Sequence, residues 1–306
     1  MNRKEFIRNG ILATTGLWSG TEMVKASTTS DIKLLTQPFN MKFSPDFGVF
    51  NVADNLNILD QIKWGYDQGF RAWENTWLRR RPVEEQEQIS RTLSSLGMEF
   101  GQFVGTLTMR EVTFAGRDQS VRDQVLKEVR ESVDIAKRMN TKFVHNVLGS
   151  ADYSLPWDFQ MANAIDLLKR VAEIYEPHGI VMVMETMNQR NHTGKFLHTI
   201  SQAYAMAKAV ASPSVKILFD FYHVQIQEGD LIPTLDYAWD EIAYLQIGDT
   251  PGRKEPGTGE INYKNVLQHV YDKGYRGFAG LEHGMSRADH EGNIGALEAY
   301  RIVDPI

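Results

Sequence analysis

The chain has 306 residues, of which 42% are hydrophobic and 24% are charged, and it contains no cysteine. This composition excludes collagen-like and disordered chains, and the lack of cysteine excludes disulfide bonds, thiolate zinc sites and a cysteine nucleophile. The formal net charge of -6 argues against nucleic acid as a partner, because proteins that hold polyphosphate backbones are usually basic.

Residues 1–30 have the pattern of an export signal. Basic residues that include Arg3 and Lys4 precede a weakly apolar, Gly/Thr-rich stretch, and Val24 and Ala26 have the spacing of a small-residue cleavage site. The segment resembles a twin-arginine signal with Arg3-Lys4 in place of the arginine pair. We therefore expect export, to the periplasm; the alternative is a cytoplasmic protein whose N-terminus forms a short amphipathic helix. No other stretch approaches the roughly 18 apolar residues that span a bilayer, so no membrane span is expected.

From residue 35 to residue 306, apolar runs of β type alternate with longer stretches of helical periodicity, of which 121–139 and 159–177 are the clearest. Repeated alternation of strand and helix predicts one α/β domain, a (β/α)8 TIM barrel. The alternative, an open doubly wound sheet, is disfavoured because no G-x-G-x-x-G motif follows the first strand. The expected strands lie within residues 41–48, 71–75, 98–106, 141–149, 180–188, 215–223, 243–249 and 277–284.

The carboxyl ends of the last four expected strands each carry a side chain that can bind a metal. Active sites of such barrels are built at these ends, and an unpaired carboxylate buried there is costly. A shared cation would satisfy all of them, and an all-oxygen ligand set suits Mg2+ or Mn2+. The alternative is that each acid pairs with a Lys or Arg inside the barrel. The predicted metal ligands are Glu185, Asp220, Gln246 and Glu282.

Other polar residues near the same strand ends are candidates for substrate contact. His223 follows Asp220 by three residues and can bind a substrate oxygen or support a metal ligand. Arg253 lies in the loop after the seventh strand, where it can clamp a carboxylate or hydroxyl, or remain solvated. The remaining candidates end the second, fourth and fifth strands, with core packing as the alternative for the first of them: Glu74, His145 and Asn188.

Several stretches resemble the hydroxypyruvate isomerase family. They are Glu185-Thr-Met-Asn188, Asp220-Phe-Tyr-His223, Pro251-Gly-Arg-Lys-Glu-Pro-Gly-Thr-Gly-Glu-Ile261 and Gly280-Leu-Glu282, and the resemblance covers residues 40–290. That family belongs to the xylose isomerase-like barrels, together with sugar isomerases and ketose 3-epimerases. The resemblance implies that the four predicted ligands bind the metal, that Glu185 and Glu282 are also the acid/base pair, and that His223 and Arg253 touch the substrate. This chain has Glu-Thr-Met-Asn where the family often has Glu-Pro-Ile-Asn.

The chemistry of such a site follows from its carboxylates. Aldose–ketose isomerisation removes a proton from the carbon next to a carbonyl, and the resulting enediolate is stabilised by a divalent cation. We expect an isomerase for a small hydroxy-carbonyl compound or sugar. The alternatives are a ketose 3-epimerase, with one glutamate on each face of the carbon, and a non-catalytic exported sugar-binding barrel. A nuclease of the endonuclease IV kind is disfavoured by the acidity and by the low number of histidines, 8. A homo-oligomer is left open.

Overall fold

The computed structural model describes residues 37–50, 56–107 and 110–306. The expected export signal at residues 1–30 lies outside these ranges and stays a prediction. Within the described parts of the chain, no helix combines the length and the apolar character that a bilayer crossing requires.

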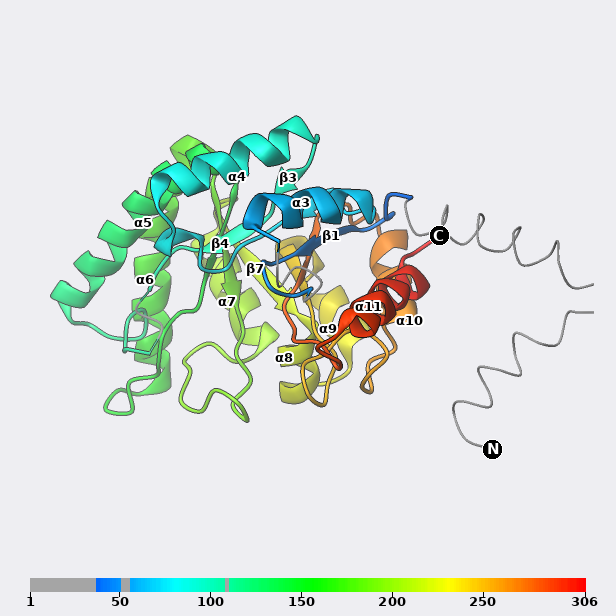
Figure 1. The fold of residues 1–306 in the computed structure, drawn as a ribbon. Helices are drawn as coiled ribbons and strands as arrows, with labels where there is room; N and C mark the ends of the chain where they lie inside the picture. Colours follow the sequence, from blue (N-terminus) through cyan, green and yellow to red (C-terminus); the bar gives the residue numbers. More distant parts are fainter. Residues whose placement is uncertain (1–36, 51–55, 108–109) are drawn as a thin grey trace, which may run out of the picture. The chain divides into compact units, whose positions relative to one another are not determined.

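Parallel strands alternate with helices along the domain Pro38–Ile306 (Figure 1). Each strand lies in, or within one residue of, an expected run, and Gly101 splits the third run into two short strands. The strands are β1 (Lys42–Pro45), β2 (Ala72–Trp73), β3 (Glu99–Phe100), β4 (Gln102–Val104), β5 (Phe143–Asn146), β6 (Val181–Glu185), β7 (Val215–Asp220), β8 (Ile242–Ile247) and β9 (Phe278–Leu281).

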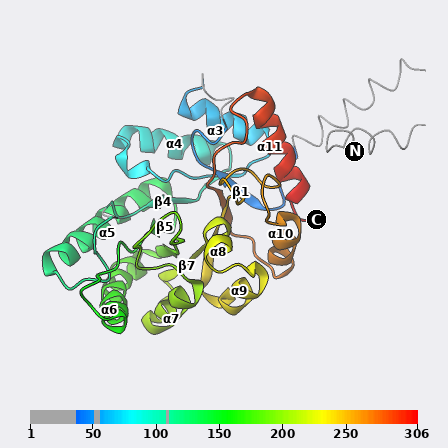
Figure 2. The same ribbon diagram turned by 90° about the horizontal axis from the view of Figure 1, so that it is seen from below.

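The helices surround the strands and follow one another around them in chain order (Figure 2). The two amphipathic stretches expected from the sequence are confirmed as α5 (Gln119–Met139) and α6 (Trp157–Tyr175). The other α-helices are α3 (Ile58–Asp67), α4 (Val83–Ser95), α7 (Ile200–Val210), α8 (Phe221–Gln227), α9 (Leu231–Tyr237), α10 (Tyr263–Asp272) and α11 (His290–Val303), and short 3-10 helices are η2 (Leu78–Arg80), η3 (Glu176–His178) and η4 (Trp239–Glu241).

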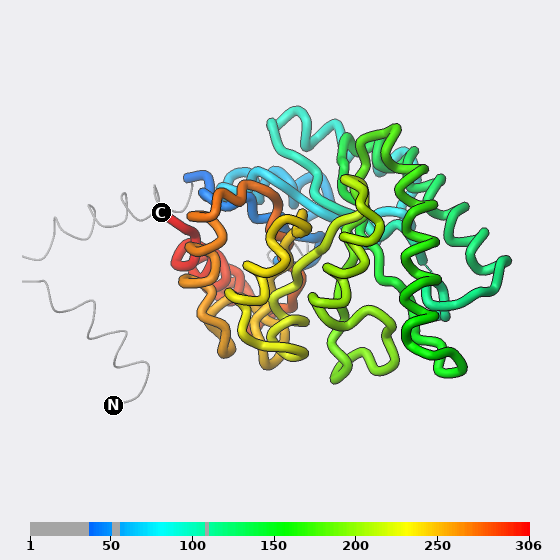
Figure 3. The backbone as a smooth tube through the Cα atoms, turned by 180° about the vertical axis from the view of Figure 1, so that it is seen from behind, coloured from blue at the N-terminus to red at the C-terminus, as the bar shows by residue number. Residues whose placement is uncertain are grey.

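The strands close into a barrel. One parallel sheet has the order β1-β9-β8-β7-β6-β5-β4, and β2 pairs with β3 in a second sheet. The backbone N–H of Glu74 donates to the Pro45 carbonyl at 2.9 Å, and that of Asn75 donates to the Gln102 carbonyl at 3.3 Å. These two bonds join β2 to the two ends of the larger sheet, which confirms the predicted closed barrel; the tube in Figure 3 follows the same path from behind.

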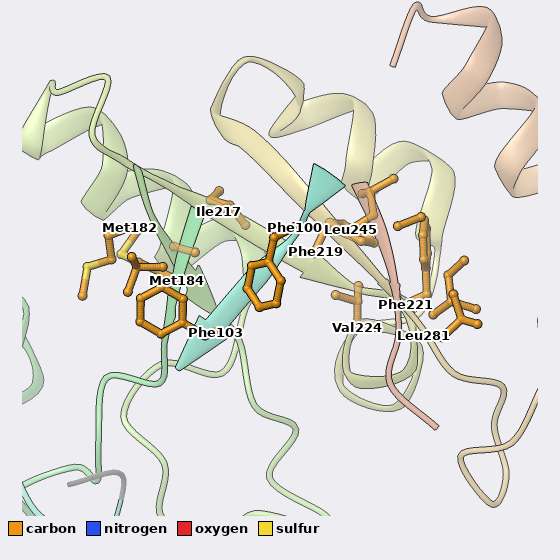
Figure 4. Close-up of a cluster of buried hydrophobic side chains, with 14 of the residues drawn as sticks. Phe100, Phe103, Met182, Met184, Ile217, Phe219, Phe221, Val224, Leu245 and Leu281 are labelled. Atoms are coloured by element: carbon orange, nitrogen blue, oxygen red, sulfur yellow. The ribbon is translucent and has the colours of Figure 1, made fainter. Parts of the chain in front are cut away.

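Side chains on alternate sides of each strand build two separate parts of the core. Met182, Met184 and Phe219 belong to the large apolar cluster that also contains residues of the surrounding helices, such as Phe221 of α8 (Figure 4). The opposite face of the same strands fills the barrel interior, because successive strand side chains point to opposite sides. That inner layer comprises Ala72, Phe143, Val183, Leu218, Tyr244 and Phe278.

The alternation of side chains along each strand also explains where the polar residues lie. Two positions beyond Val183, Leu218 and Tyr244, toward the carboxyl end of each strand, the same inner face carries an acidic or amide side chain. The apolar inner layer therefore forms a floor, and the next layer above it is polar. The residues of that next layer on β6, β7 and β8 are Glu185, Asp220 and Gln246.

Candidate metal centre and active site

The predicted metal ligands come together at the carboxyl end of the barrel. Asp220 lies opposite Gln246 in the β7–β8 register, and Gln246 lies opposite Gly280, two residues before Glu282. Glu185 ends the neighbouring strand β6. Glu185, Asp220 and Gln246 are buried, whereas the side chain of Glu282 is 29% exposed. Three ligand candidates are thus buried among strand ends, and the fourth faces solvent in part.

Several of these side chains carry buried polar atoms without a hydrogen-bond partner among the described residues. They are Oε1 of Glu185, both amide atoms of Gln246 and Oε2 of Glu282, of which the last is in an ion pair with Arg253 at 3.0 Å. Buried polar atoms are nearly always satisfied, so converging oxygens without partners indicate a ligand. Carboxylate and amide oxygens suit a hard divalent cation. The residues present therefore fit the predicted metal site.

Asp220 is oriented by the start of α8. Its Oδ1 accepts hydrogen bonds from the backbone N–H groups of Tyr222 at 2.8 Å and His223 at 3.4 Å, which makes it the N-cap of this helix. The other oxygen, Oδ2, accepts a bond from the Arg253 guanidinium at 2.8 Å. Burial raises the pKa of Asp220, although His223 and Arg253 act in the opposite direction.

Arg253 reaches the site from a loop that Asp249 organises. The Asp249 carboxylate accepts backbone hydrogen bonds from residues 250, 257, 259 and 261 at 2.9 to 3.1 Å. A side chain at Gly259 would approach the Thr250 carbonyl to 2.1 Å, so only glycine fits this turn. The Arg253 guanidinium lies between two predicted ligands, 2.8 Å from Asp220 and 3.0 Å from Glu282. The predicted substrate-binding arginine thus contacts the carboxylates of the centre.

The two predicted acid/base residues have opposite pKa shifts. Burial is the largest single effect on Glu185 and raises its pKa, but the combined effects of His145, 2.9 Å away, His223 and Arg253 lower this pKa to about 2. Burial is also the largest single effect on His145 and lowers its pKa, but Glu185, Glu282 and Asp220 together raise it. Burial raises the pKa of Glu282 to about 7, and Glu185 and Asp220 add to it against the effect of Arg253. Carboxyl groups whose pKa values are separated in this way are typical of acid/base pairs.

His223 points one ring nitrogen into the centre and the other at Asn188. Its Nδ1 accepts from the Asn188 backbone N–H at 3.3 Å and from the Asn188 side-chain amide at 2.6 Å. The Asn188 side chain is oriented by its Oδ1, which accepts from the Asn191 backbone at 2.8 Å. The proton of a neutral His223 is therefore on Nε2, which lies 3.4 Å from Glu185 and 3.7 Å from Asp220.

This tautomer decides what His223 can do. Glu185, Asp220 and His223 have potential ligand atoms within 4.8 Å of one another. A protonated Nε2, however, has no lone pair for a metal, and within the described residues it has no hydrogen-bond partner. His223 therefore presents a buried donor to an oxygen in the site. Asn188, a predicted substrate contact, orients this histidine, and its contact with substrate stays a prediction.

Glu74 is buried inside the barrel. Its carboxyl group accepts hydrogen bonds from the Tyr244 hydroxyl at 2.6 Å and the Gln102 amide at 3.1 Å, and it is fully buried. A side chain at Gly280 would come within 2.4 Å of Glu74 Oε2, so this glycine provides the space for the carboxyl group. Burial raises the pKa of Glu74 well above its usual value. Glu74 is thus held by residues of the barrel interior, and its contact with substrate stays a prediction.

A pocket of about 430 Å³ opens beside Glu282 and Arg253. Its other wall includes residues that follow β1 and β2, among them Asp46, Phe47 and Trp77. Asp46 and Phe47 were not predicted from the sequence, although the rule that polar residues follow strand ends applies to Asp46, one residue beyond β1. The pocket gives the centre an opening large enough for a small organic molecule.

Comparisons with known proteins agree with this fold. The family model described as xylose isomerase-like TIM barrel matches residues 62–301. The hydroxypyruvate isomerase of Escherichia coli K12 is 29% identical over 61% of this chain and 70% of its own. The 2-oxo-tetronate isomerase of Pectobacterium atrosepticum is 24% identical over 80% of this chain and 93% of its own.

Solved structures show the same fold at lower identity. A Brucella melitensis protein described as an AP endonuclease of family 2 has a TM-score of 0.70 at 23% identity, covering 82% of this chain and 96% of that one. A D-psicose 3-epimerase has a TM-score of 0.67 at 17% identity, and the match covers 85% of this chain and 90% of that one. At these identities the likeness establishes the barrel fold alone.

Proposed function

The chain belongs to the xylose isomerase-like TIM barrels, and we propose that it is a metal-dependent isomerase of a small hydroxy-carbonyl compound such as hydroxypyruvate. One observation carries this proposal: the acid/base candidates Glu185 and Glu282 converge with Gln246 at one end of the barrel, and each of the three carries a buried oxygen without a hydrogen-bond partner among the described residues. The names of the relatives, hydroxypyruvate isomerase and 2-oxo-tetronate isomerase, support the reaction class.

The proposed cofactor is one Mg2+ or Mn2+ ion held by Glu185, Asp220, Gln246 and Glu282. Such an ion would polarise the carbonyl group and offset the negative charge that develops on the substrate oxygens. The oxygen-only donor set supports these hard cations over metals that prefer nitrogen or sulfur. The tautomer of His223 supports the same set, because Nε2 carries the proton and has no lone pair for a metal.

The protein side chains would move the protons. An ionised carboxylate takes a proton from the carbon that bears the hydroxyl group, and the proton returns to the carbon that bore the carbonyl. The hydroxyl proton passes to the other oxygen, so the product is an isomer with the carbonyl group on the neighbouring carbon. Glu185, held ionised by His145, is suited to be the base. His223 can donate from Nε2 to a substrate oxygen as charge accumulates there.

A ketose 3-epimerase is the second candidate. Glu185 and Glu282 end the separate strands β6 and β9, so each can approach the substrate from its own side. An epimerase needs this arrangement, with one carboxyl group for each face of the reacting carbon. An isomerase can work with a single carboxyl group on one face.

Solvent exchange followed by proton NMR separates the two candidates. Protein supplied with Mg2+ or Mn2+ is incubated in D2O with hydroxypyruvate, 2-oxo-tetronate and a panel of ketoses. If the protein is an isomerase, an acid substrate is converted to its carbonyl isomer. If it is an epimerase, C3 of a ketose is inverted and the proton on C3 exchanges with solvent. The proposal is wrong if no compound of the panel is converted or exchanged with either metal.

A further inference from the structure

A lysine lies next to Gly284, one of the residues that line the pocket beside Glu282. Lys254 follows Arg253 in the loop after β8, and its backbone forms a bridge with Asp249 through bonds of 2.7 and 3.3 Å. Its Nζ lies 3.0 Å from the point where a Cβ atom on Gly284 would stand. Gly284 lines the pocket together with Glu282 and Arg253. The loop geometry and the bare glycine thus place the ammonium group next to the opening.

The Lys254 ammonium group differs from the other cations of the centre in its pairing. Arg253 contacts both Asp220 and Glu282, and His145 pairs with Glu185. For Lys254, no ion-pair partner is found among the residues that the structure describes, although the side chain is half-buried. A half-buried ammonium group without a counter-ion is suited to bind an anion.

The proposed reaction creates a need for such a group. A short hydroxy or oxo acid would bring its own carboxylate close to Glu185, Asp220 and Glu282, and like charges at this range repel one another. A cation on the pocket side would offset that repulsion and also fix the orientation of the acid.

We propose that Lys254 binds the carboxylate group of the substrate and thereby selects short hydroxy and oxo acids over neutral hydroxy-carbonyl compounds. This inference rests on the proposed function and names the substrate class for the same site. Lys254 is then a specificity-determining residue, while proton transfer stays with the glutamates.

Arg80 supplies a matched control on the other wall. Its guanidinium stacks 4.0 Å above the ring of Trp77, which lines the pocket opposite Gly284. Replacement of either cation by glutamine removes one positive charge near the opening. Only Lys254→Gln, however, removes the proposed contact with the substrate carboxylate.

Steady-state kinetics with hydroxypyruvate and its neutral analogue dihydroxyacetone test the proposal. Loss of one charge-assisted hydrogen bond predicts a KM for hydroxypyruvate that is about 10- to 100-fold higher in Lys254→Gln, with kcat within about threefold. The KM for dihydroxyacetone should stay unchanged. Lys254→Arg should keep most of the affinity, and Arg80→Gln should resemble the wild type. An equal rise of KM in both glutamine variants, or no rise in either, overturns the inference.

A binding measurement without turnover distinguishes this inference from the proposed function. Calorimetric titration of the metal-supplied protein with glycerate and with glycerol compares an acid and a neutral compound of similar size. Preference for glycerate that disappears in Lys254→Gln supports the inference, even if hydroxypyruvate is not converted and the proposed function fails. If the wild type binds glycerate no better than glycerol, Lys254 does not select acids, whatever the turnover.

Discussion

Asn188 donates two hydrogen bonds to the same nitrogen of His223, one from its backbone N–H at 3.3 Å and one from its side chain at 2.6 Å. A backbone N–H can only donate, so Nδ1 must be unprotonated. A contact between residues 35 positions apart thus determines which form of the imidazole faces the centre. The pair links the end of β6 to the first turn of α8.

Replacement of Asn188 tests this role. Asn188→Asp keeps the size of the side chain but replaces the side-chain donor at 2.6 Å by a charged acceptor, which outweighs the longer backbone bond at 3.3 Å, favours the other tautomer and removes the donor at Nε2. We expect kcat of Asn188→Asp to fall on the order of 100-fold, since a wrong tautomer impairs a catalytic histidine. The decrease of kcat in Asn188→Ala should be smaller. Nitrogen NMR shifts of His223 report the tautomer directly. Asn265→Asp, at an exposed position, is the control; wild-type kcat in Asn188→Asp would contradict the prediction.

Metal binding should stabilise the protein. An ion that binds only the folded state adds about 2.7 kcal/mol at a concentration 100 times its Kd. Mg2+ or Mn2+ should therefore raise the melting temperature of the wild type, and EDTA should reverse the increase. Asp220→Ala should abolish the response, whereas Asp240→Ala, which removes an acid that is 55% exposed, should keep it. If the wild type itself does not respond, internal ion pairs explain the buried acids better.

Glu185→Gln and Glu282→Gln should each remove proton transfer while they keep one ligand oxygen. The expected loss of kcat is about 100-fold or more, the usual effect of a positioned acid or base. Deuterium exchange at the reacting carbon shows whether one glutamate or both are needed. Glu298→Gln changes an exposed acid on α11 and should have no effect. Full activity of both site variants would show that these glutamates carry no protons.

The buried Glu74 makes stability depend on pH. Because its pKa is raised in the folded state, the folded protein keeps a proton that the unfolded chain releases above about pH 4.5. Between the pKa of Glu74 in the unfolded chain and its higher pKa in the folded protein, each rise of one pH unit therefore lowers the free energy of unfolding by about 1.4 kcal/mol. The free energy of unfolding of Glu74→Gln minus that of the wild type should therefore rise by the same amount for each pH unit. Urea unfolding at pH 5, 6 and 7 measures this difference. A difference independent of pH would show that Glu74 is ionised in the barrel.

Gly280 should not tolerate a side chain. A Cβ atom there would lie 2.4 Å from Glu74 Oε2, so Gly280→Ala should lower the free energy of unfolding by about 1 to 3 kcal/mol. Gly295 on α11 has no atom within 4 Å of its Cβ position, and Gly295→Ala should add up to about 1 kcal/mol by favouring the helix. Equal effects of the two substitutions in urea unfolding would contradict this account.

The barrel and the convergence of the four predicted ligands follow from patterns that the sequence displays. The period of two along β6, β7 and β8 places Glu185, Asp220 and Gln246 on the inner face, and the carboxyl ends of parallel strands meet at one end of a barrel. The family resemblance is confirmed by the match to residues 62–301.

Other features depend on contacts that local patterns do not encode. Glu74 also ends an apolar run, yet it packs inside the barrel, because Gly280, more than 200 positions later, leaves space for it. The position of Arg253 depends on the hydrogen bonds that Asp249 receives across its loop. The partner of Asn188 depends on the path of the chain after β6. To predict each of these contacts, one must know how far apart distant segments of the chain lie in the fold, and the order of residues alone does not supply this.

The two walls of the pocket beside Glu282 come from opposite ends of the chain. Asp46, Phe47 and Trp77 follow β1 and β2, whereas the predicted metal ligands follow β6 to β9. Substitutions in the first wall can therefore change which molecule enters without altering the ligands of the centre.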